Sequence, residues 1–461
     1  MHLPGTVAHG HRGSSGRNSR QITQSSLCLS EAGGIQNFGF SMIAQKEQDP
    51  ALLSVAEEVR DFYDQYPYPR PIDNLEKYRQ AWQDPQRRRA DYHLAWPAAT
   101  YKEDLSILIA GCGTSQAAKH AVRWPLAQII GIDVSETGVR CTEELKRKHK
   151  LNNLQVHQLP LERVSELGVN FDQIVCTGVL HHLADPEAGL RALRGVLRPE
   201  GAIHLMVYAP YGRAGIYMLQ EFCKRTGIRA NDREIRDLFT ALSALPPGHP
   251  LEKLLREAPD FRQEAALADA LLHPQDRAYS VPQLFNFLER GGLKFGRWVR
   301  QAAYSPRCGV VAQIPQASRM TRFPLDEQYA AIELFRGTMV RHSLIVYRND
   351  SSVGAKPISF VGDAWRGYVP IRMPDTIVVQ DWLSSGVGPV LINQSHTYRD
   401  LFMPIDATEN QWLDSIDGNR NVDDILNRTV SPVQQSPQIE KARRFFERLW
   451  WYDQVVFDAS R

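Results

Sequence analysis

Residues 105–110 read Leu-Ser-Ile-Leu-Ile-Ala, and residues 111–114 continue as Gly-Cys-Gly-Thr. The apolar run predicts a buried β-strand, and the glycines after it predict a tight turn. Residues 115–123 can form a helix, and a second apolar run, Ala-Gln-Ile-Ile-Gly-Ile, occupies residues 127–132. A strand, a helix and a second strand within about thirty residues make up the parallel βαβ unit.

The same alternation continues towards the C-terminus. Helices are predicted over residues 136–149 and 186–197, and strands over residues 154–157, 171–177 and 202–208. This pattern predicts an α/β fold: a Rossmann-like, open, mostly parallel sheet with helices on both faces.

A helical stretch then interrupts the pattern at residues 211–278, and we interpret it as a cap inserted into the domain. Within it, residues 273–279 carry several polar side chains, which could cover a pocket or form an ordinary turn. The alternation resumes with a helix and two strands, expected at residues 280–290, 294–299 and 308–314. We therefore expect this domain to span residues 104–316.

The N-terminal region differs in composition. Residues 1–39 are rich in Ser, Gly, Arg and His and hold one acidic residue, so we expect a disordered tail over residues 1–45. There are two alternatives. The segment could be a transit peptide, or it could be upstream sequence that precedes a true start at Met42. Residues 46–103 are predicted to form a helical lead-in, whose first helix, over residues 52–66, ends at Tyr-Pro-Tyr-Pro-Arg-Pro.

Residues 320–461 are predicted to form a smaller α+β domain. Its last stretch places three helices and a strand at residues 409–416, 422–428, 439–452 and 454–457, an order that resembles a winged-helix module. The third helix interleaves its basic residues with Phe445, Phe446, Trp450 and Trp451. We expect these aromatic residues to form a core rather than a base-stacking surface. The domain is thus expected to recognise a substrate or a partner.

Composition excludes several classes of protein. The 54 Lys and Arg residues against 52 Asp and Glu leave a net charge of +2, which makes nucleic-acid binding an unlikely role. The six cysteines are scattered, which argues against a metal site or a disulfide framework and suits a cytoplasmic protein. The apolar runs are too short to span a membrane. The oligomeric state stays open.

The turn at Gly111 and Gly113 follows a strand and opens a helix, where bare backbone can approach a ligand. It is not the GxGxxG loop of dinucleotide-binding proteins, because Gln116 occupies the place of the third glycine. Asp133 ends the second strand, twenty-two positions after Gly111. A carboxylate at this place can accept hydrogen bonds from both hydroxyls of a ribose.

Four blocks of sequence, within about residues 104–208, resemble the class I S-adenosylmethionine-dependent methyltransferases. They begin at Ile107, Gly131, Phe171 and Leu193 and read ILIAGCGT, GIDVS, FDQIVCTGVLHHLADP and LRGVLRPEG. The stretch FYDQYPYP, which begins at Phe62, is similar to the lead-in of certain bacterial members. The resemblance implies that S-adenosylmethionine binds to the Rossmann-like domain.

By this resemblance, the cofactor-binding residues are expected at the carboxyl ends of the strands. They are Ala110, Gly111, Cys112 and Gly113 at the first turn, Asp133 and Val134 after the second strand, Leu161 and Glu162 beside the adenine, and Thr177 and Gly178 facing the sulfonium. Independently of the resemblance, Tyr63, Tyr66 and Tyr68 of the lead-in are expected to fold over the cofactor as a lid. Packing of the lead-in helix against the sheet is the alternative.

Methyl transfer needs mainly alignment of donor and acceptor, and a base only where the acceptor carries a proton to remove. Adjacent residues on a helix point about 100° apart. At most one of His181 and His182 is therefore expected to face the pocket. His181 is the candidate base, with capping or packing as the alternative. Tyr211 and Arg213, after the fifth strand, are placed to bind the acceptor.

The sequence therefore predicts an S-adenosylmethionine-dependent methyltransferase with a small-molecule or protein side-chain acceptor. A non-catalytic protein that binds S-adenosylmethionine and holds a partner through the winged-helix-like module is the alternative. A nucleic-acid methyltransferase is disfavoured, because no Asn/Asp-Pro-Pro-Tyr motif follows Val175.

Overall fold

The computed structural model describes residues 50–252, 255, 259–352, 357–380, 388–429 and 435–460. The tail predicted over residues 1–45 and the alternative start at Met42 lie outside these ranges. Within them, no helix combines the length and the apolar character needed to cross a membrane.

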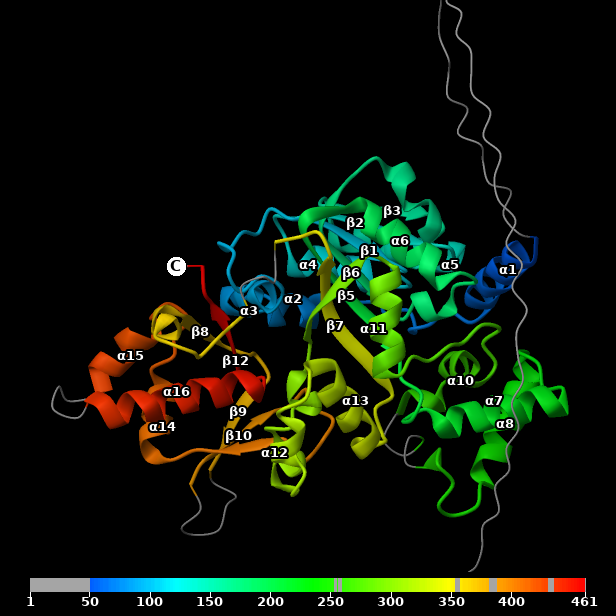
Figure 1. Ribbon diagram of the computed structural model, residues 1–461. Helices are drawn as coiled ribbons and strands as arrows, with labels where there is room; N and C mark the ends of the chain where they lie inside the picture. Colours follow the sequence, from blue (N-terminus) through cyan, green and yellow to red (C-terminus); the bar gives the residue numbers. More distant parts are fainter. Residues whose placement is uncertain are drawn as a thin grey trace, which may run out of the picture. The chain divides into compact units, whose positions relative to one another are not determined.

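A seven-stranded sheet forms the centre of the molecule (Figure 1). Its spatial order is β3 (Leu154–Gln158), β2 (Gln128–Asp133), β1 (Ser106–Ala110), β4 (Phe171–Thr177), β5 (Leu197–Tyr208), β7 (Arg341–Arg348) and β6 (Leu293–Trp298). Strands β1 to β5 run parallel to one another, whereas β7 is antiparallel to both β5 and β6. The predicted α/β, Rossmann-like fold is confirmed, and the sheet is mixed.

The strand predicted at residues 308–314 is wrong. Residues Gly309–Gln313 form a short 3-10 helix, η5. Its first backbone N–H donates to the hydroxyl of Tyr452 at 3.0 Å and is therefore not available to a sheet. The seventh strand is β7 instead, which lies after residue 316, where the sequence analysis ended the domain. It pairs with β5 from Ala202 to Tyr208.

Helices cover both faces of the sheet because side chains alternate along each strand. Leu108 and Ala110 belong to one core, with α6 (Pro186–Val196) and α11 (Val281–Arg290). Ile107 and Ile109 belong to the opposite core, with α3 (Pro85–Ala95), α4 (Gln116–Arg123) and α5 (Glu136–His149). The sheet is thus buried on both sides, and its carboxyl edge is left for a ligand.

The lead-in packs against the cap. Its helices are α1 (Pro50–Gln65), α2 (Glu76–Ala81) and α3, and the cap contains α7 (Ala214–Thr226), α8 (Asp232–Ser243) and α10 (Glu264–Leu271), which lie together in Figure 1. Phe62 and Tyr66 of the lead-in are buried in one cluster with Ile216 and Leu267 of the cap. Two segments far apart in the sequence therefore share a core.

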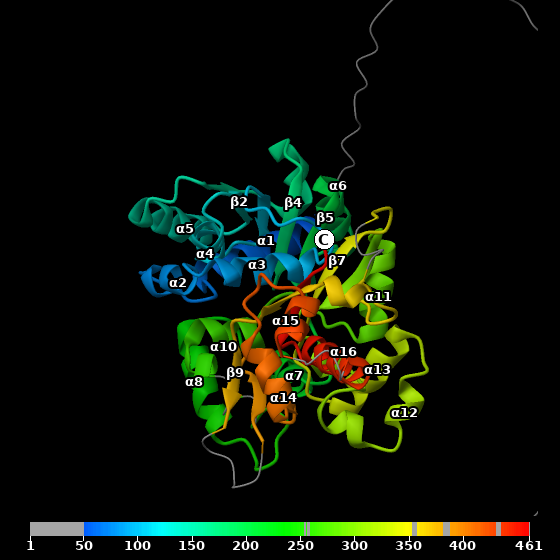
Figure 2. The ribbon, with the colours of Figure 1, turned by 90° about the vertical axis from the view of Figure 1, so that its left-hand side faces the viewer.

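The C-terminal region contains two small antiparallel sheets and three helices. Its elements are β8 (Val369–Arg372), β9 (Thr376–Val379), β10 (Val390–Asn393), β11 (Phe402–Pro404), α14 (Ala407–Asp414), α15 (Val422–Thr429), α16 (Gln435–Trp451) and β12 (Val455–Asp458). Figure 2 shows α14, α15 and α16 gathered beside β9. The last strand, β12, pairs with β8, which precedes all three helices. Phe445 and Phe446 are fully buried in the core of this region, as expected.

The C-terminal region also packs on the lead-in. Ala90 and Leu94 of α3 lie in one apolar cluster with Ile371 of β8 and Val456 of β12. In the chain, α12 (Ala317–Met320) and α13 (Leu325–Arg336) lie between β6 and β7, and they pack in the core that contains α11.

Candidate active site

A cavity of about 1160 Å³ opens at the carboxyl ends of β1, β2, β4 and β5. Ligands bind at this edge in open α/β sheets, because the loops that leave neighbouring strands diverge there. The cavity brings together most of the predicted residues. They are Tyr63, Gly111, Gly113, Asp133, Val134, Leu161, Thr177, Gly178, Tyr211 and Arg213.

Five predicted residues lie behind this surface. Ala110, Cys112 and His181 are fully buried, and Tyr66 is nearly so. Glu162 is half-buried next to Leu161, and burial raises the pKa of its carboxyl group. Leu161 is therefore the member of that pair that borders the cavity.

Steric limits require glycine at positions 111 and 113 of the turn. Gly111 has φ +71° and Gly113 has φ +51°, both in the left-handed region that disfavours a side chain. A Cβ atom at position 111 would also lie 2.2 Å from Cγ2 of Val179. The turn thus presents bare backbone to the cavity, as its sequence predicts.

Asp133 holds the turn in place. Its Oδ2 accepts the backbone N–H of Gly113 at 2.7 Å, and its Oδ1 accepts that of Ser135 at 2.9 Å. Burial raises the pKa of this carboxyl group, and the two hydrogen bonds oppose the shift. Each carboxylate oxygen has a second lone pair, so the side chain can still accept hydroxyl donors from the cavity. The carboxylate of Asp133 offers hydrogen-bond acceptors and no donors to the cavity. It therefore suits two adjacent hydroxyls, such as those of a ribose.

The lead-in is fastened to this end of the cavity. The carboxylate of Asp64 accepts from Ser135 Oγ at 2.7 Å and from the N–H of Thr137 at 3.1 Å. Thr114 donates its hydroxyl to the carbonyl of Pro69 at 2.7 Å. These bonds place Tyr68 and Pro69 on the cavity wall.

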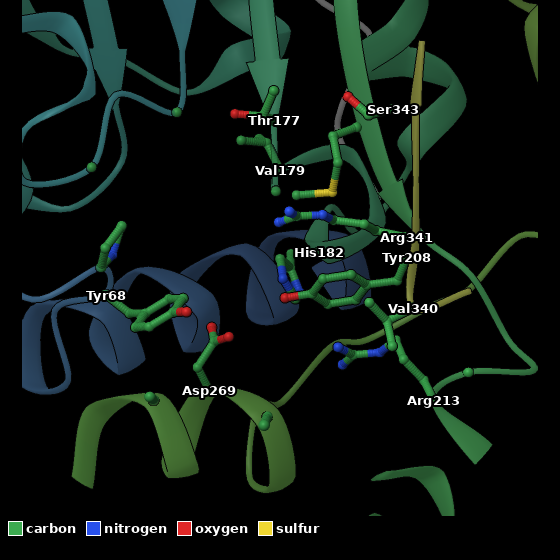
Figure 3. A pocket seen from close by; sticks show the side chains of 18 of the residues that line it. Tyr68, Thr177, Val179, His182, Tyr208, Arg213, Asp269, Val340, Arg341 and Ser343 are labelled. Carbon is green, nitrogen blue, oxygen red and sulfur yellow. The ribbon is translucent and has the colours of Figure 1, made fainter. Parts of the chain in front are cut away.

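The opposite end of the cavity is built from charged and aromatic side chains, several of which Figure 3 shows together. The guanidinium of Arg213 lies 3.5 Å from the ring centre of Tyr208 and forms an ion pair with Asp276 at 2.9 Å. Both partners of the ion pair are nearly fully buried. Tyr211, which is 41% exposed, stands at the rim. Arg213 therefore has its charge compensated within the wall.

The two adjacent histidines occupy different environments on η2 (Leu180–His182). The ring of His181 is tilted against that of Tyr208, with their centres 3.9 Å apart, and neither of its nitrogens has a hydrogen-bond partner. Burial holds the pKa of His181 well below its ordinary value. His182 lines the cavity instead, and its Nδ1 lies 2.7 Å from the carbonyl oxygen of Gln275.

The cavity also contains residues that the sequence did not single out. Asp269 of α10 accepts the hydroxyl of Tyr63 at 2.9 Å, and Arg341 begins β7. His273, which does not line the cavity itself, contacts His182. His273 belongs to the polar stretch at residues 273–279, which was a signal for a pocket cover. Asp269 lies inside a helix without any motif, so the sequence held no signal for it.

A loop of the C-terminal region completes the wall. Its contributing residues are Ser395, His396, Thr397, Tyr398 and Leu401. Asp400 of this loop pairs with Arg336 at the end of α13, at 3.3 Å. The cavity thus reaches from the glycine turn to the C-terminal region.

Comparison with known proteins gives matches of two kinds in sequence. A methyltransferase domain family matches residues 108–203. An uncharacterized protein of Synechococcus sp. is 30% identical over 328 residues, which cover 66% of this chain and 77% of that protein. The ubiquinone biosynthesis O-methyltransferase of Acinetobacter baylyi is 23% identical over 163 residues, which cover 35% of this chain and 63% of that enzyme.

Solved structures share the fold. PKMT2 from Rickettsia typhi, determined in complex with AdoHcy, superposes with a TM-score of 0.59 at 14% identity. The superposition covers 82% of this chain and 76% of PKMT2, so the likeness extends beyond the central sheet.

Proposed function

This chain belongs to the class I S-adenosylmethionine-dependent methyltransferases, and we propose that its cavity holds the methyl donor at one end and the acceptor at the other. The observation that carries this proposal is the continuity of the cavity from Asp133 to Arg213. The acceptor is a small molecule or a protein side chain.

The donor end fits S-adenosylmethionine. Asp133 offers acceptor lone pairs to the two ribose hydroxyls, and the turn at Gly111 and Gly113 leaves room for the amino acid part. Val134, Leu161, Thr177 and Gly178 line the cavity, which supports the first two as the border of the adenine and the last two as the residues that face the sulfur. When bound, S-adenosylmethionine supplies a methyl group on a positively charged sulfur.

The residues of the chain align the two reactants and exclude water. A displacement at carbon is accelerated mainly by holding the reacting atoms about 3–3.5 Å apart in line. The cap and the lead-in, joined through Tyr63 and Asp269, cover the cavity. Tyr211 and Arg213 are placed on the acceptor side. Membership of an enzyme family makes methyl transfer, rather than passive binding of the cofactor, the working function.

We further propose that the region after residue 320 selects the acceptor. Five residues of its 395–401 loop line the cavity, and a residue of that loop can contact the acceptor directly. The same region contacts the lead-in through α3. Recognition of the acceptor by this region is also compatible with a protein partner.

A label-transfer experiment tests the proposal. The full chain is first titrated with S-adenosylhomocysteine by calorimetry, and is then incubated with methyl-tritiated S-adenosylmethionine and extracts of small molecules or of protein. We expect binding and transfer of tritium to one of the two pools. Binding without transfer to either pool would favour the non-catalytic role, and absence of binding would reject the donor site.

A further inference from the structure

Three side chains of the acceptor end lie unusually close together. His182, Asp269 and His273 each place one ring nitrogen or carboxylate oxygen within 4.8 Å of the others. His182 and Asp269 are almost fully buried, and His273 is less buried than either of them. Such a group can hold a metal ion or transfer a proton, and the hydrogen bonds of the two rings decide between these roles.

His273 has its proton on Nε2. Its Nδ1 accepts the backbone N–H of Gln275 at 3.0 Å, and an amide N–H can only donate. Burial lowers the pKa of His273 to about 2, so the ring is neutral. The remaining nitrogen, Nε2, therefore carries hydrogen and has no lone pair for a metal. It has no hydrogen-bond partner either, so a buried donor points at this cluster.

His182 has the opposite arrangement. Its Nδ1 lies 2.7 Å from the carbonyl oxygen of the same residue, Gln275, and a carbonyl can only accept. Nδ1 of His182 is therefore protonated, and the lone pair is on Nε2. The backbone of Gln275 thus sets the two rings, whose centres lie 3.9 Å apart, in opposite tautomers. Only two of the three groups keep a free lone pair, which favours proton transfer over a metal.

Asp269 completes the proton-accepting group. Its Oδ1 accepts the hydroxyl of Tyr63 at 2.9 Å, which fixes the carboxylate beside the rings. Burial raises the pKa of Asp269, and His182 opposes this shift by its charge when it is protonated. The carboxylate therefore stabilises His182 after His182 has gained a proton.

The charges around the cluster indicate what kind of acceptor it serves. Arg213 is compensated by Asp276, whereas Arg341 forms no ion pair with any residue that the structure describes. Arg341 stands opposite Tyr208 in the sheet register, and Figure 3 shows its guanidinium extending into the cavity. An uncompensated guanidinium repels an ammonium group and attracts an oxygen that gains negative charge.

We propose that His182 is a catalytic base and that the acceptor is a phenol, whose oxygen is methylated beside Arg341. This inference rests on the proposed function. A phenol is favoured over an aliphatic alcohol for two reasons: a histidine accepts a proton far more readily from an acidic hydroxyl, and the wall offers the rings of Tyr63, Tyr68 and Tyr208 to a flat aromatic molecule.

The step is balanced as follows. The phenol proton passes to Nε2 of His182, and the oxygen forms a bond to the donor's methyl carbon. The bond from that carbon to sulfur breaks, and its electron pair stays on the sulfur, which becomes a neutral thioether. The product is an aryl methyl ether, and the proton leaves His182 for water.

The ionisation of a coloured phenol tests this assignment without turnover. The full chain is saturated with S-adenosylhomocysteine, and 4-nitrophenol, whose phenolate absorbs visible light, is titrated into it at a series of pH values. We expect the bound phenol to ionise at least about one pH unit lower than the free phenol, a tenfold shift in its equilibrium.

Two variants and a control identify the residues that cause the shift in the ionisation of the bound phenol. His182→Gln and Arg341→Met should each remove most of it, whereas His157→Gln, which changes an exposed histidine on β3, should leave it intact. Arg341 is exposed, so its variant keeps the test valid even where His182→Gln fails to fold.

Three outcomes would overturn the proposal. They are bound 4-nitrophenol that ionises as it does in water, no binding up to about 10 mM, and a zinc titration in which binding of the metal is lost in His182→Gln. Failure of S-adenosylhomocysteine to bind is a separate result, which would reject the proposed function itself.

Discussion

The two ends of the cavity are built in different ways. At the donor end, the wall includes the bare backbone of Gly111 and Gly113, and Asp133 joins the turns after β1 and β2 through two amide hydrogen bonds. At the acceptor end, the wall is made of side chains, and it combines Tyr63 of the lead-in, Asp269 of the cap and Arg341 of β7. The first end comes from one continuous part of the chain, between Gly111 and Gly178, whereas the second needs segments from the whole chain.

Because the two ends are built differently, substitutions at each end should affect different properties of the protein. Substitutions at the donor end alter the shape of the backbone and should reduce affinity for the donor. Substitutions at the acceptor end remove charges or hydrogen bonds between distant segments and should reduce stability and turnover instead.

The largest expected effect is on stability, from Arg213→Ala. It leaves the buried carboxylate of Asp276 uncompensated, which should lower the free energy of unfolding by about 3–5 kcal/mol. Affinity for S-adenosylhomocysteine should stay nearly unchanged. Urea denaturation and calorimetry measure the two quantities. Arg225→Ala is the matched control, because its ion pair with Glu221 is exposed and should contribute about 0–1 kcal/mol. Lost affinity at normal stability would move Arg213 to the donor end.

A hundredfold loss of donor affinity is expected from Gly111→Ala, equivalent to about 2.7 kcal/mol. The new Cβ would clash with Val179, and the left-handed backbone would have to change. Gly168→Ala separates the two causes, since Gly168 has φ +63° but no atom within 4 Å of its added Cβ. That control should lose about 1–2 kcal/mol of stability and no affinity. Equal affinities in both variants would contradict a backbone-built donor end.

A smaller loss of affinity, at least about tenfold, is expected from Asp133→Ala. Hydrogen bonds from two hydroxyls to a carboxylate contribute about 1.5–3 kcal/mol each, and part of this is offset when water replaces them. Calorimetry with S-adenosylhomocysteine on the folded variant measures the loss. An unchanged dissociation constant would reject the contact between Asp133 and the ribose.

The smallest effect is a change of pH dependence, from His181→Phe. Because burial lowers the pKa of His181, the unfolded chain binds a proton below about pH 6.5 that the folded chain does not. The burial of neutral His181 therefore costs no stability above about pH 6.5. Below that pH, it lowers the free energy of unfolding by at most about 1.4 kcal/mol per pH unit. Urea denaturation of His181→Phe between about pH 6.5 and 5 should show a shallower decline than the wild type. An identical decline would mean that His181 takes up a proton in the folded protein.

The donor end could be predicted from the sequence because its geometry is local. The spacing from Gly111 to Asp133 is that of a turn, one helix and one strand, and the structure places both residues on the cavity. The sequence prediction chose His181, whereas His182 is the one that lines the cavity. The direction of each ring depends on the short η2 and on contacts with Gln275, which no local pattern indicates.

The acceptor end depends on long-range packing. Asp269 lies in α10, in which residues 266–271 are all buried and form no motif, and Tyr63 reaches it from 206 positions away. Arg341 precedes a run that reads as a strand but gives no indication of its partner strand. No local pattern connects these residues, so their meeting is a property of the fold alone.

The position of β7 determines when the molecule can fold during its synthesis. Strand β6 pairs only with β7 in the sheet, and β7 is also the outer neighbour of β5. While the ribosome is still making the residues between Tyr208 and Arg341, the edge of β5 has no partner, and exposed edges invite aggregation. A chain that stops at residue 320 would lack β7, so the catalytic sheet cannot be isolated by cutting there. Any fragment meant to bind the donor must extend past Arg348.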